Sequence, residues 1–327
     1  MEQRHLGRTG LRVSRLALGT MTWGRDTDEH EARDQLTAFV EAGGTLVDTA
    51  ASYGDGDSER VLGGLIGQLV QRHELVIATK AGISRRTSER VVDVSRRTLL
   101  DELDGSLLRL GIDAVDLWQV HTWSDAVPIE ETLAALDLAY SSGRARYVGV
   151  SNYSGWQTSL AATYQAAWPG RAPLAATQVE YSLLERGIER EVVPAARALG
   201  LGILPWSPLG RGVLTGKYRT GTPADSRAAS PHFERFVGTY LDKRGHRIVD
   251  AVCRAAEGLG LAPLEVALAW VRDRPGVSAP VVGSRTAAHL RGSLTVEDVE
   301  LPAEITAALD DVSAVPLGYP ERPDNGR

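Results

Sequence analysis

Four ionisable side chains lie at or just after the ends of short apolar runs within the first 121 residues. Asp48 stands near the end of the run Thr45–Thr49, and Tyr53 follows it in a glycine-containing loop. Lys80 and His121 end two further runs. Apolar and β-branched runs followed by such loops indicate strands that end at one edge of a sheet. The sequence therefore predicts that these four side chains face a ligand rather than a core.

The combination predicts proton donation by a phenol. A free tyrosine titrates near 10, so it is a poor acid at neutral pH unless a neighbouring cation lowers its pKa. We expect Lys80 to be that cation, Asp48 to hold and neutralise Lys80, and His121 to orient a carbonyl oxygen beside the phenol. A carbonyl polarised in this way requires a reductant.

Each residue also has an ordinary structural interpretation. Asp48 alone would be a loop cap, Tyr53 an aromatic at the rim with a solvated hydroxyl, Lys80 a solvated lysine and His121 a hydrogen-bonded core histidine. The coincidence of all four at predicted strand ends favours shared chemistry.

Eight strand-like runs alternate with helical patterns of apolar residues at three-and-four spacing. This α/β pattern predicts a single (β/α)8 TIM barrel over residues 1–327, because most steps from strand to strand are near thirty residues. A doubly wound open sheet is the alternative, but Gly19–Gly24 lacks the glycine fingerprint expected after its first strand. The eight runs are Arg15–Thr20, Thr45–Thr49, Glu74–Lys80, Ala114–His121, Ala145–Ser151, Leu174–Glu180, Gly202–Ser207 and Val277–Gly283.

Segments outside this repeat are also recognisable. Arg4–Val13 is predicted to form an N-terminal hairpin. The long step after the seventh strand is interpreted as a loop, Pro208–Tyr240, followed by an added helix over Asp242–Gly258. The tail Gly318–Arg327 is expected to be a mobile end.

Composition limits the partners. The net charge of −6 and the pI near 5.7 give no sign of the overall basic character that binding to nucleic acid or an anionic membrane requires, and they leave room for a local basic patch that binds a phosphate. The polar start Met1–His5 is not a signal peptide, so we expect a soluble cytoplasmic protein with a small-molecule partner. The single cysteine, Cys253, excludes an internal disulfide and is predicted to be a buried structural thiol, because it lies at helical spacing from Ile248, Val249, Val252 and Ala256.

The residues carry a family resemblance. The runs Leu46–Ala50 with Tyr53-Gly54, Ala78–Lys80 and Asp116–His121 resemble the aldo-keto reductases, and the match covers almost the whole chain. The resemblance implies hydride transfer from NADPH to an aldehyde or ketone, with Tyr53 as general acid in a tetrad with Asp48, Lys80 and His121. The potassium-channel β-subunit relatives have asparagine where His121 stands, so the histidine favours an enzyme. The alternative is an NADPH-binding regulatory or redox-sensing protein with little turnover.

The same resemblance assigns a nicotinamide site. Ser151, Asn152 and Gln178 would hydrogen-bond the carboxamide, and Trp206 would stack on the ring. The ordinary alternatives are a cap by Ser151 or Asn152 for a helix over Trp156–Tyr164, and plain packing for Trp206. Further cofactor contacts are expected from Gly19, Thr20, Asp48, Ser207, Pro208, Leu209, Gly210 and Arg211.

Two segments are candidates for phosphate binding. Gly210–Lys217 is not a P-loop, because Arg211 replaces the first glycine and Tyr218 follows the lysine. By resemblance this segment covers the pyrophosphate, with Lys217 and Arg227 as contacts. Gly283, Ser284 and Arg285 precede a predicted helix, a place suited to a phosphate, and the resemblance assigns the adenosine 2′-phosphate to Arg285. Relatives have Gln and Asn where this chain has His289 and Ser293, which leaves NADH as the alternative cofactor.

The substrate pocket is expected to be lined by Trp23, Tyr53, His121 and Trp123. An indole-rich pocket suits an apolar or ring-bearing carbonyl, although both tryptophans could equally shield the rim from solvent. A metal-dependent hydrolase would need several converging His and carboxylate ligands. This face offers only His121, so no metal is expected.

Overall fold

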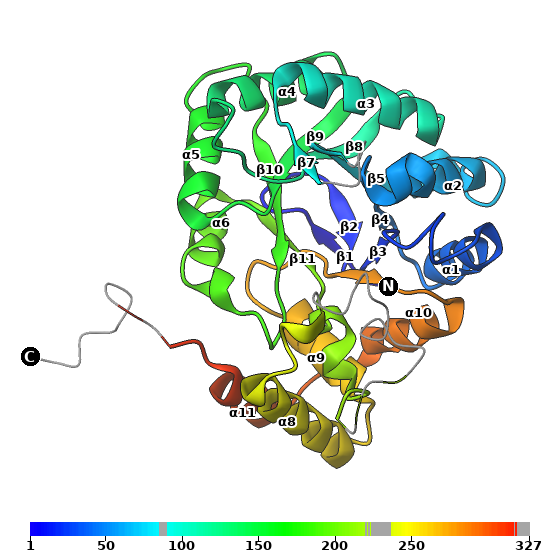
Figure 1. Cartoon of the computed structure of the whole chain (residues 1–327), viewed down its shortest axis with the longest axis vertical. Helices are drawn as coiled ribbons and strands as arrows, with labels where there is room; N and C mark the ends of the chain where they lie inside the picture. Colours follow the sequence, from blue (N-terminus) through cyan, green and yellow to red (C-terminus); the bar gives the residue numbers. More distant parts are fainter. Residues whose placement is uncertain (85–89, 220, 222, 224–236, 317, 319–327) are drawn as a thin grey trace, which may run out of the picture.

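The computed structural model describes residues 1–84, 90–219, 221, 223, 237–316 and 318. Within these residues, eight parallel strands close into a barrel, and helices surround it (Figure 1). This confirms the predicted (β/α)8 TIM barrel. The barrel strands are β3 (Ala17–Gly19), β4 (Leu46–Asp48), β5 (Val76–Ala81), β8 (Val115–Val120), β9 (Ala145–Ser151), β10 (Leu174–Glu180), β11 (Gly202–Trp206) and β12 (Val281–Gly283). They neighbour one another in this order, and β12 pairs with β3.

The barrel strands are buried on both faces, as expected for a parallel sheet that helices cover. One face of each strand fills the interior, where Leu46, Ala78 and Leu117 belong to one apolar cluster. Side chains alternate along a strand, so the residues two positions further on also point inward. Those residues include Asp48 and Lys80, which places polar groups directly above the apolar interior.

Glycines in the left-handed region end several of the helices. Gly111 (φ 66°) and Gly200 (φ 77°) cap α3 and α6. The α-helices are α1 (Glu29–Glu41), α2 (Asp57–Leu65), α3 (Arg96–Leu110), α4 (Ile129–Ser141), α5 (Gly155–Ala166), α6 (Val192–Leu199), α8 (Lys243–Leu259), α9 (Pro263–Arg272), α10 (Ala287–Leu294) and α11 (Ala303–Ser313). The 3-10 helices are η1 (Tyr53–Gly56), η2 (Arg72–Glu74), η3 (Gly187–Glu189), η4 (Gly210–Thr215) and η6 (Thr295–Asp298).

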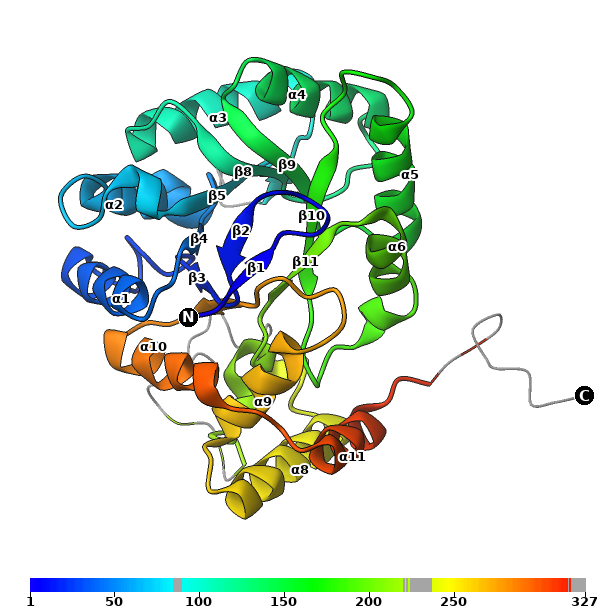
Figure 2. The same cartoon turned by 180° about the vertical axis from the view of Figure 1, so that it is seen from behind.

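The predicted N-terminal hairpin is confirmed. Strands β1 (Gln3–His5) and β2 (Arg12–Ser14) pair in antiparallel register, and Figure 2 shows them lying across one end of the barrel. Leu6 and Val13 are fully buried in the same cluster as the interior residues of the barrel. A second short ladder joins β6 (Ile83–Ser84) to β7 (Val91–Val92).

Three expectations need correction or fall outside the described residues. Two helices, α8 and α9, lie between β11 and β12 where one added helix was predicted. The α9 helix, in which Val266–Arg272 are all buried, was missed. Cys253 on α8 is only half-buried. Most of the tail Gly318–Arg327 lies outside the described residues.

Among the described helices, none combines the length and apolar character that a membrane crossing requires.

Candidate active site

The structure brings Asp48, Tyr53, Lys80 and His121 together. Lys80 Nζ donates to Asp48 Oδ2 at 2.7 Å, to the carbonyl oxygen of Thr49 at 2.9 Å and to Tyr53 Oη at 3.3 Å. The rings of Tyr53 and His121 meet edge to face with their centroids 6.0 Å apart. Strands β4, β5 and β8 are neighbours in the barrel, so their carboxyl ends place these groups around one point.

The loop that carries Tyr53 turns sharply. Gly54 (φ 56°), Asp55 (φ 53°) and Gly56 (φ 92°) are all left-handed, which returns the chain into α2 immediately after Tyr53. Such a run needs glycine at most positions, since other residues rarely adopt this region.

A buried ion pair supports the strand that carries Lys80. The fully buried Glu59 of α2 accepts hydrogen bonds from Thr79 Oγ1 at 2.5 Å and from Arg109 Nε at 2.7 Å. These contacts join α2, β5 and α3 behind the site. Sequence reasoning missed this pair.

The charge state of the Lys80 and Tyr53 pair differs in part from expectation. Burial lowers the pKa of Lys80, but the nearby Asp48 carboxylate and Tyr53 outweigh it and raise that pKa above its ordinary value. Lys80 is therefore an ammonium ion. Burial also raises the pKa of Tyr53 by more than Lys80 lowers it. The prediction that Lys80 brings the tyrosine pKa below its usual value was thus wrong for this arrangement, and Tyr53 is a protonated phenol at neutral pH.

His121 is held neutral. Burial, with Lys80 and Arg90 nearby, places the pKa of His121 well below 6.5. Its backbone N–H donates to the carbonyl of Ala81, whereas Nδ1 is buried without a hydrogen-bond partner among the described residues. A buried unpaired nitrogen is costly, so the imidazole can gain by hydrogen bonding to a ligand.

The expected carboxamide contacts surround the same centre. Ser151 Oγ is buried and has no partner among the described residues. The cap of α5 is Ser154, whose side chain accepts from Gln157 N, so the helix-capping alternative for Ser151 and Asn152 was wrong. Gln178 is already engaged, because its Nε2 donates to Asp48 Oδ1 at 2.8 Å across the barrel.

Asn152 connects two of the other predicted site residues. Its backbone is left-handed (φ 58°), its Nδ2 donates to the carbonyl of His121 at 2.9 Å, and its Oδ1 accepts from Trp206 Nε1 at 2.9 Å. Trp206 is thereby fixed at the end of β11.

Glycines end the two strands that follow β11 around the barrel, β12 and β3. Gly19 and Gly283 follow the inward-facing Ala17 and Val281 by two positions, so both face the interior. A Cβ on Gly19 would approach Val281 Cγ1 to 2.8 Å. The Trp206 indole and the Ser151 hydroxyl, which is buried and unpaired among the described residues, are groups that suit a planar ring bearing an amide. The Thr20 hydroxyl is not available there, because it is 2.7 Å from Ser58 Oγ and donates to the carbonyl of Asp48.

The segment after β11 is tied to the end of β10. Ser207 (φ 53°) and the consecutive residues Gly210 to Gly212 are left-handed. Glu180 accepts two hydrogen bonds from the guanidinium of Arg211, at 2.9 and 2.7 Å, and one from Tyr240 Oη at 2.9 Å. A phosphate contact by Arg211 would therefore come from its backbone. Of the other residues expected here, Pro208 is buried, Leu209 half-buried and Lys217 exposed, and Arg227 lies outside the described residues.

Hydrogen bonds fix the backbone of the second phosphate candidate, Gly283–Arg285. The backbone carbonyls of Ser284 and Arg285 accept hydrogen bonds from Thr22 at 3.0 Å and Thr27 at 3.3 Å. Thr286 caps α10 through the backbone N–H of His289, whose side chain is exposed. The hydroxyl of Ser284 is buried and unpaired among the described residues.

One predicted pocket residue lies elsewhere. Trp23 has no exposed surface, and its Nε1 donates to Gln35 Oε1 at 3.0 Å. It belongs to the core between the barrel and α1 and does not line a pocket, because the chain after β3 folds the indole inward. Trp123 is half-buried and meets Tyr153 and Trp156 edge to face, at 5.2 and 5.3 Å.

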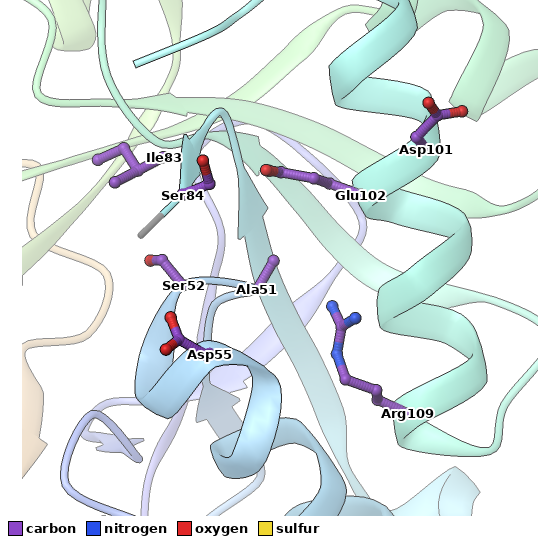
Figure 3. A pocket seen from close by; sticks show the side chains of 8 residues that line it. All are labelled: Ala51, Ser52, Asp55, Ile83, Ser84, Asp101, Glu102 and Arg109. Atoms are coloured by element: carbon purple, nitrogen blue, oxygen red, sulfur yellow. The ribbon is translucent and has the colours of Figure 1, made fainter. Parts of the chain in front are cut away.

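Two cavities flank the site. One of about 550 Å³ is bordered by Asn152 and Trp206. The other, of about 350 Å³, lies on the outer side of the Tyr53 loop between Asp55, Glu102 and Arg109, and none of the four central residues lines it (Figure 3). Among the described residues, no three His, Cys, Asp or Glu side chains are grouped to hold a metal ion.

Comparison with known proteins identifies the family of the chain. The sequence model of the Aldo/keto reductase family matches residues 15–314. The chain belongs to the aldo/keto reductase family. This aldo/keto reductase is 36% identical to the "uncharacterized oxidoreductase YrpG" of Bacillus subtilis (97% of this chain and 98% of that protein). It is 32% identical to the "aldo-keto reductase YhdN" of the same organism (97% and 96%), and 33% identical to a "probable voltage-gated potassium channel subunit beta" of Oryza sativa subsp. japonica (100% of each). Family membership and the oxidoreductase names indicate an oxidoreductase.

Proposed function

We propose that this aldo/keto reductase reduces an aldehyde or ketone to an alcohol with NADPH, and that Tyr53 donates the proton. The observation that carries the proposal is the position of Lys80 Nζ, which contacts both Asp48 Oδ2 (2.7 Å) and Tyr53 Oη (3.3 Å). A lone structural lysine would not need a phenol and a carboxylate together in a buried site.

Tyr53, Lys80 and Asp48 have separate roles in the proposed reaction. A bound reduced nicotinamide supplies the hydride. Tyr53 gives its proton to the carbonyl oxygen as that oxygen gains negative charge, and Lys80 stabilises the phenolate left behind. The raised pKa of Tyr53 keeps the proton in place at neutral pH, and a phenol is still a far stronger acid than an aliphatic alcohol. Asp48 keeps Lys80 charged and in position.

His121 and the amide-binding residues orient the reactants in this proposal. The neutral imidazole offers a hydrogen bond to the carbonyl oxygen beside Tyr53 Oη. Ser151 Oγ, with Asn152 and Gln178, would hold the carboxamide and thereby select one face of the ring, next to Trp206. In this proposal Trp123 forms one wall of the substrate pocket, which suits a substrate with an apolar or ring-bearing body.

The test is oxidation of NADPH in the presence of nitrobenzaldehyde-type substrates. Removal of the Tyr53 hydroxyl, as Tyr53→Phe, should lower kcat by about 10²- to 10⁴-fold, the usual contribution of a positioned general acid. Cofactor affinity should change little. Equal rates for the wild type and Tyr53→Phe would exclude the phenol as the acid.

A regulatory role with little turnover is the second candidate. It is favoured by the relatives that are named as potassium-channel β subunits. In that case the wild type would bind NADPH but reduce no activated aldehyde at a measurable rate.

A further inference from the structure

A carboxylate from α1 occupies the amino end of α10. The backbone N–H of Ala287 donates to Glu31 Oε2 at 2.7 Å, and that of His289 donates to Thr286 Oγ1 at 3.3 Å. The first N–H groups of a helix have no partner within it and attract anions. In this chain one of these groups already holds an anion that belongs to the protein.

A buried hydroxyl without a partner in the described part of the chain lies at the same turn. Ser284 Oγ, three residues before Ala287, belongs to a side chain that is 7% exposed, and it has no hydrogen-bond partner among the described residues. Thr22 and Thr27 fix the backbone of Ser284 and Arg285 from the other side. The turn is therefore a preformed polar site rather than an adaptable loop.

Glu31 is itself held in position. Its backbone N–H donates to Asp28 Oδ1, the cap of α1, at 2.9 Å, so it lies in the fixed first turn of that helix. Rotating its side chain away would leave Ala287 N–H without its present acceptor. The carboxylate is only half-buried, so its charge is felt at the turn and is partly screened by solvent.

We infer that Glu31 is a specificity-determining residue that weakens the preference for NADPH over NADH. The inference rests on the proposed function, in which the turn Ser284–Arg285 receives the adenosine end of the cofactor. A carboxylate repels a 2′-phosphate, whereas it can accept a hydrogen bond from a free 2′-hydroxyl, and arginine has the opposite preference. Arg285 and Glu31 thus act against each other at one helix terminus.

The decisive variant is Glu31→Gln. The amide oxygen can still accept from Ala287 N–H, so the cap is kept and only the charge is removed. The matched control is Glu29→Gln, because Glu29 lies in the same turn of α1, is exposed, and loses the same charge. Dissociation constants are measured by titration with NADPH, NADH, 2′,5′-ADP and 5′-AMP, so the readout does not depend on turnover.

We expect Glu31→Gln to raise the affinity for NADPH relative to NADH by about tenfold. The affinity for 2′,5′-ADP relative to 5′-AMP should rise similarly, because those fragments carry only the adenosine end. The effect should shrink in about 1 M salt, where charges are screened within about 3 Å. Glu31→Ala, which also removes the acceptor, should change both ratios in the same direction.

Several results would overturn the inference. Unchanged ratios in Glu31→Gln, in a protein that binds both dinucleotides, would remove Glu31 from this role. An equal rise in Glu29→Gln would assign the effect to the overall charge of α1. Failure of the wild type to bind either dinucleotide would instead refute the proposed function.

Discussion

The three N–H donors of Lys80 are all directed at oxygen atoms, from Asp48, Thr49 and Tyr53. An ammonium ion buried in this way cannot turn to water, so its position relative to the phenol is fixed before any substrate arrives. Such preorganisation is the usual source of electrostatic catalysis. His121 completes the group as a neutral ring, because the buried ammonium ion and the apolar surroundings both oppose a second positive charge.

The buried neutral histidine predicts an effect on stability. The pKa of His121 lies well below 6.5 in the folded chain and near 6.5 in the unfolded chain. Below about pH 6.5 the unfolded chain therefore binds more protons, and the free energy of unfolding falls as the pH drops towards the folded pKa. In the variant His121→Asn, the free energy of unfolding should fall less steeply with decreasing pH. The slope should be smaller by up to about 1.4 kcal/mol per pH unit.

Urea unfolding at a series of pH values between about 5 and 8 measures this effect. His246→Asn is the matched control, because His246 is exposed on α8. Parallel pH curves for the wild type and His121→Asn would show that the imidazole is not held neutral.

At the scale of elements, α2 and α3 support the site from behind. Glu59 of α2 has no exposed surface and bonds both Thr79, next to Lys80 on β5, and Arg109 of α3. Two helices and a strand thus share one carboxylate. Removing the Arg109 guanidinium would leave the buried Glu59 carboxylate without a compensating positive charge.

Arg109→Leu should therefore reduce the free energy of unfolding by about 3 kcal/mol, measured by urea denaturation. Arg60→Leu is the matched control, because Arg60 forms an exposed pair with Asp57 on the same helix α2 and should cost less than about 1 kcal/mol. Similar losses in the two variants would contradict a special role for the buried pair.

At the scale of the whole molecule, the two ends of the barrel have separate tasks. The β1–β2 hairpin closes one end with Leu6 and Val13 (Figure 2). Asp48 and Lys80 point inward beyond Leu46 and Ala78, at the carboxyl ends of the strands. Stability and chemistry should thus respond to different substitutions, as is usual for this fold.

Leu6→Ala should cost about 2–5 kcal/mol of unfolding free energy, since it empties a fully buried position. The KM and kcat of the folded fraction should stay near the wild-type values. Leu11→Ala in the same hairpin is the control, because Leu11 is only partly buried and should cost less. A fall in kcat without a loss of stability in Leu6→Ala would contradict this separation.

Short-range patterns in the sequence predicted those features of the fold and the site that depend on where each strand ends. The eight barrel strands and the meeting of Asp48, Lys80 and His121 follow from where apolar runs end, because adjacent parallel strands share an edge. Contacts between distant segments left no comparable signal. Glu31 and Ala287 are 256 residues apart in sequence, and the inward turn of Trp23 depends on Gln35 of a later helix.

Some missed features had a usable signal. Glu180 lies two residues beyond Gln178 on β10, so strand periodicity already placed it on the inward face. The sign of the net pKa shift of Tyr53 had none, because it depends on a balance between burial and Lys80 that only the folded arrangement decides.

The carboxylate of Glu180 affects how freely the stretch between Arg211 and Tyr240 can change in length and sequence. It binds Arg211 and Tyr240, two residues 29 positions apart in the chain, to one point at the end of β10. Their separation is thereby set by the scaffold and not by the stretch that joins them. Doubling the length of a joined stretch costs only about 0.6 kcal/mol of closure entropy. Insertions and exchanges between these two anchors should thus cost little stability, while the barrel and its buried ammonium ion stay as they are.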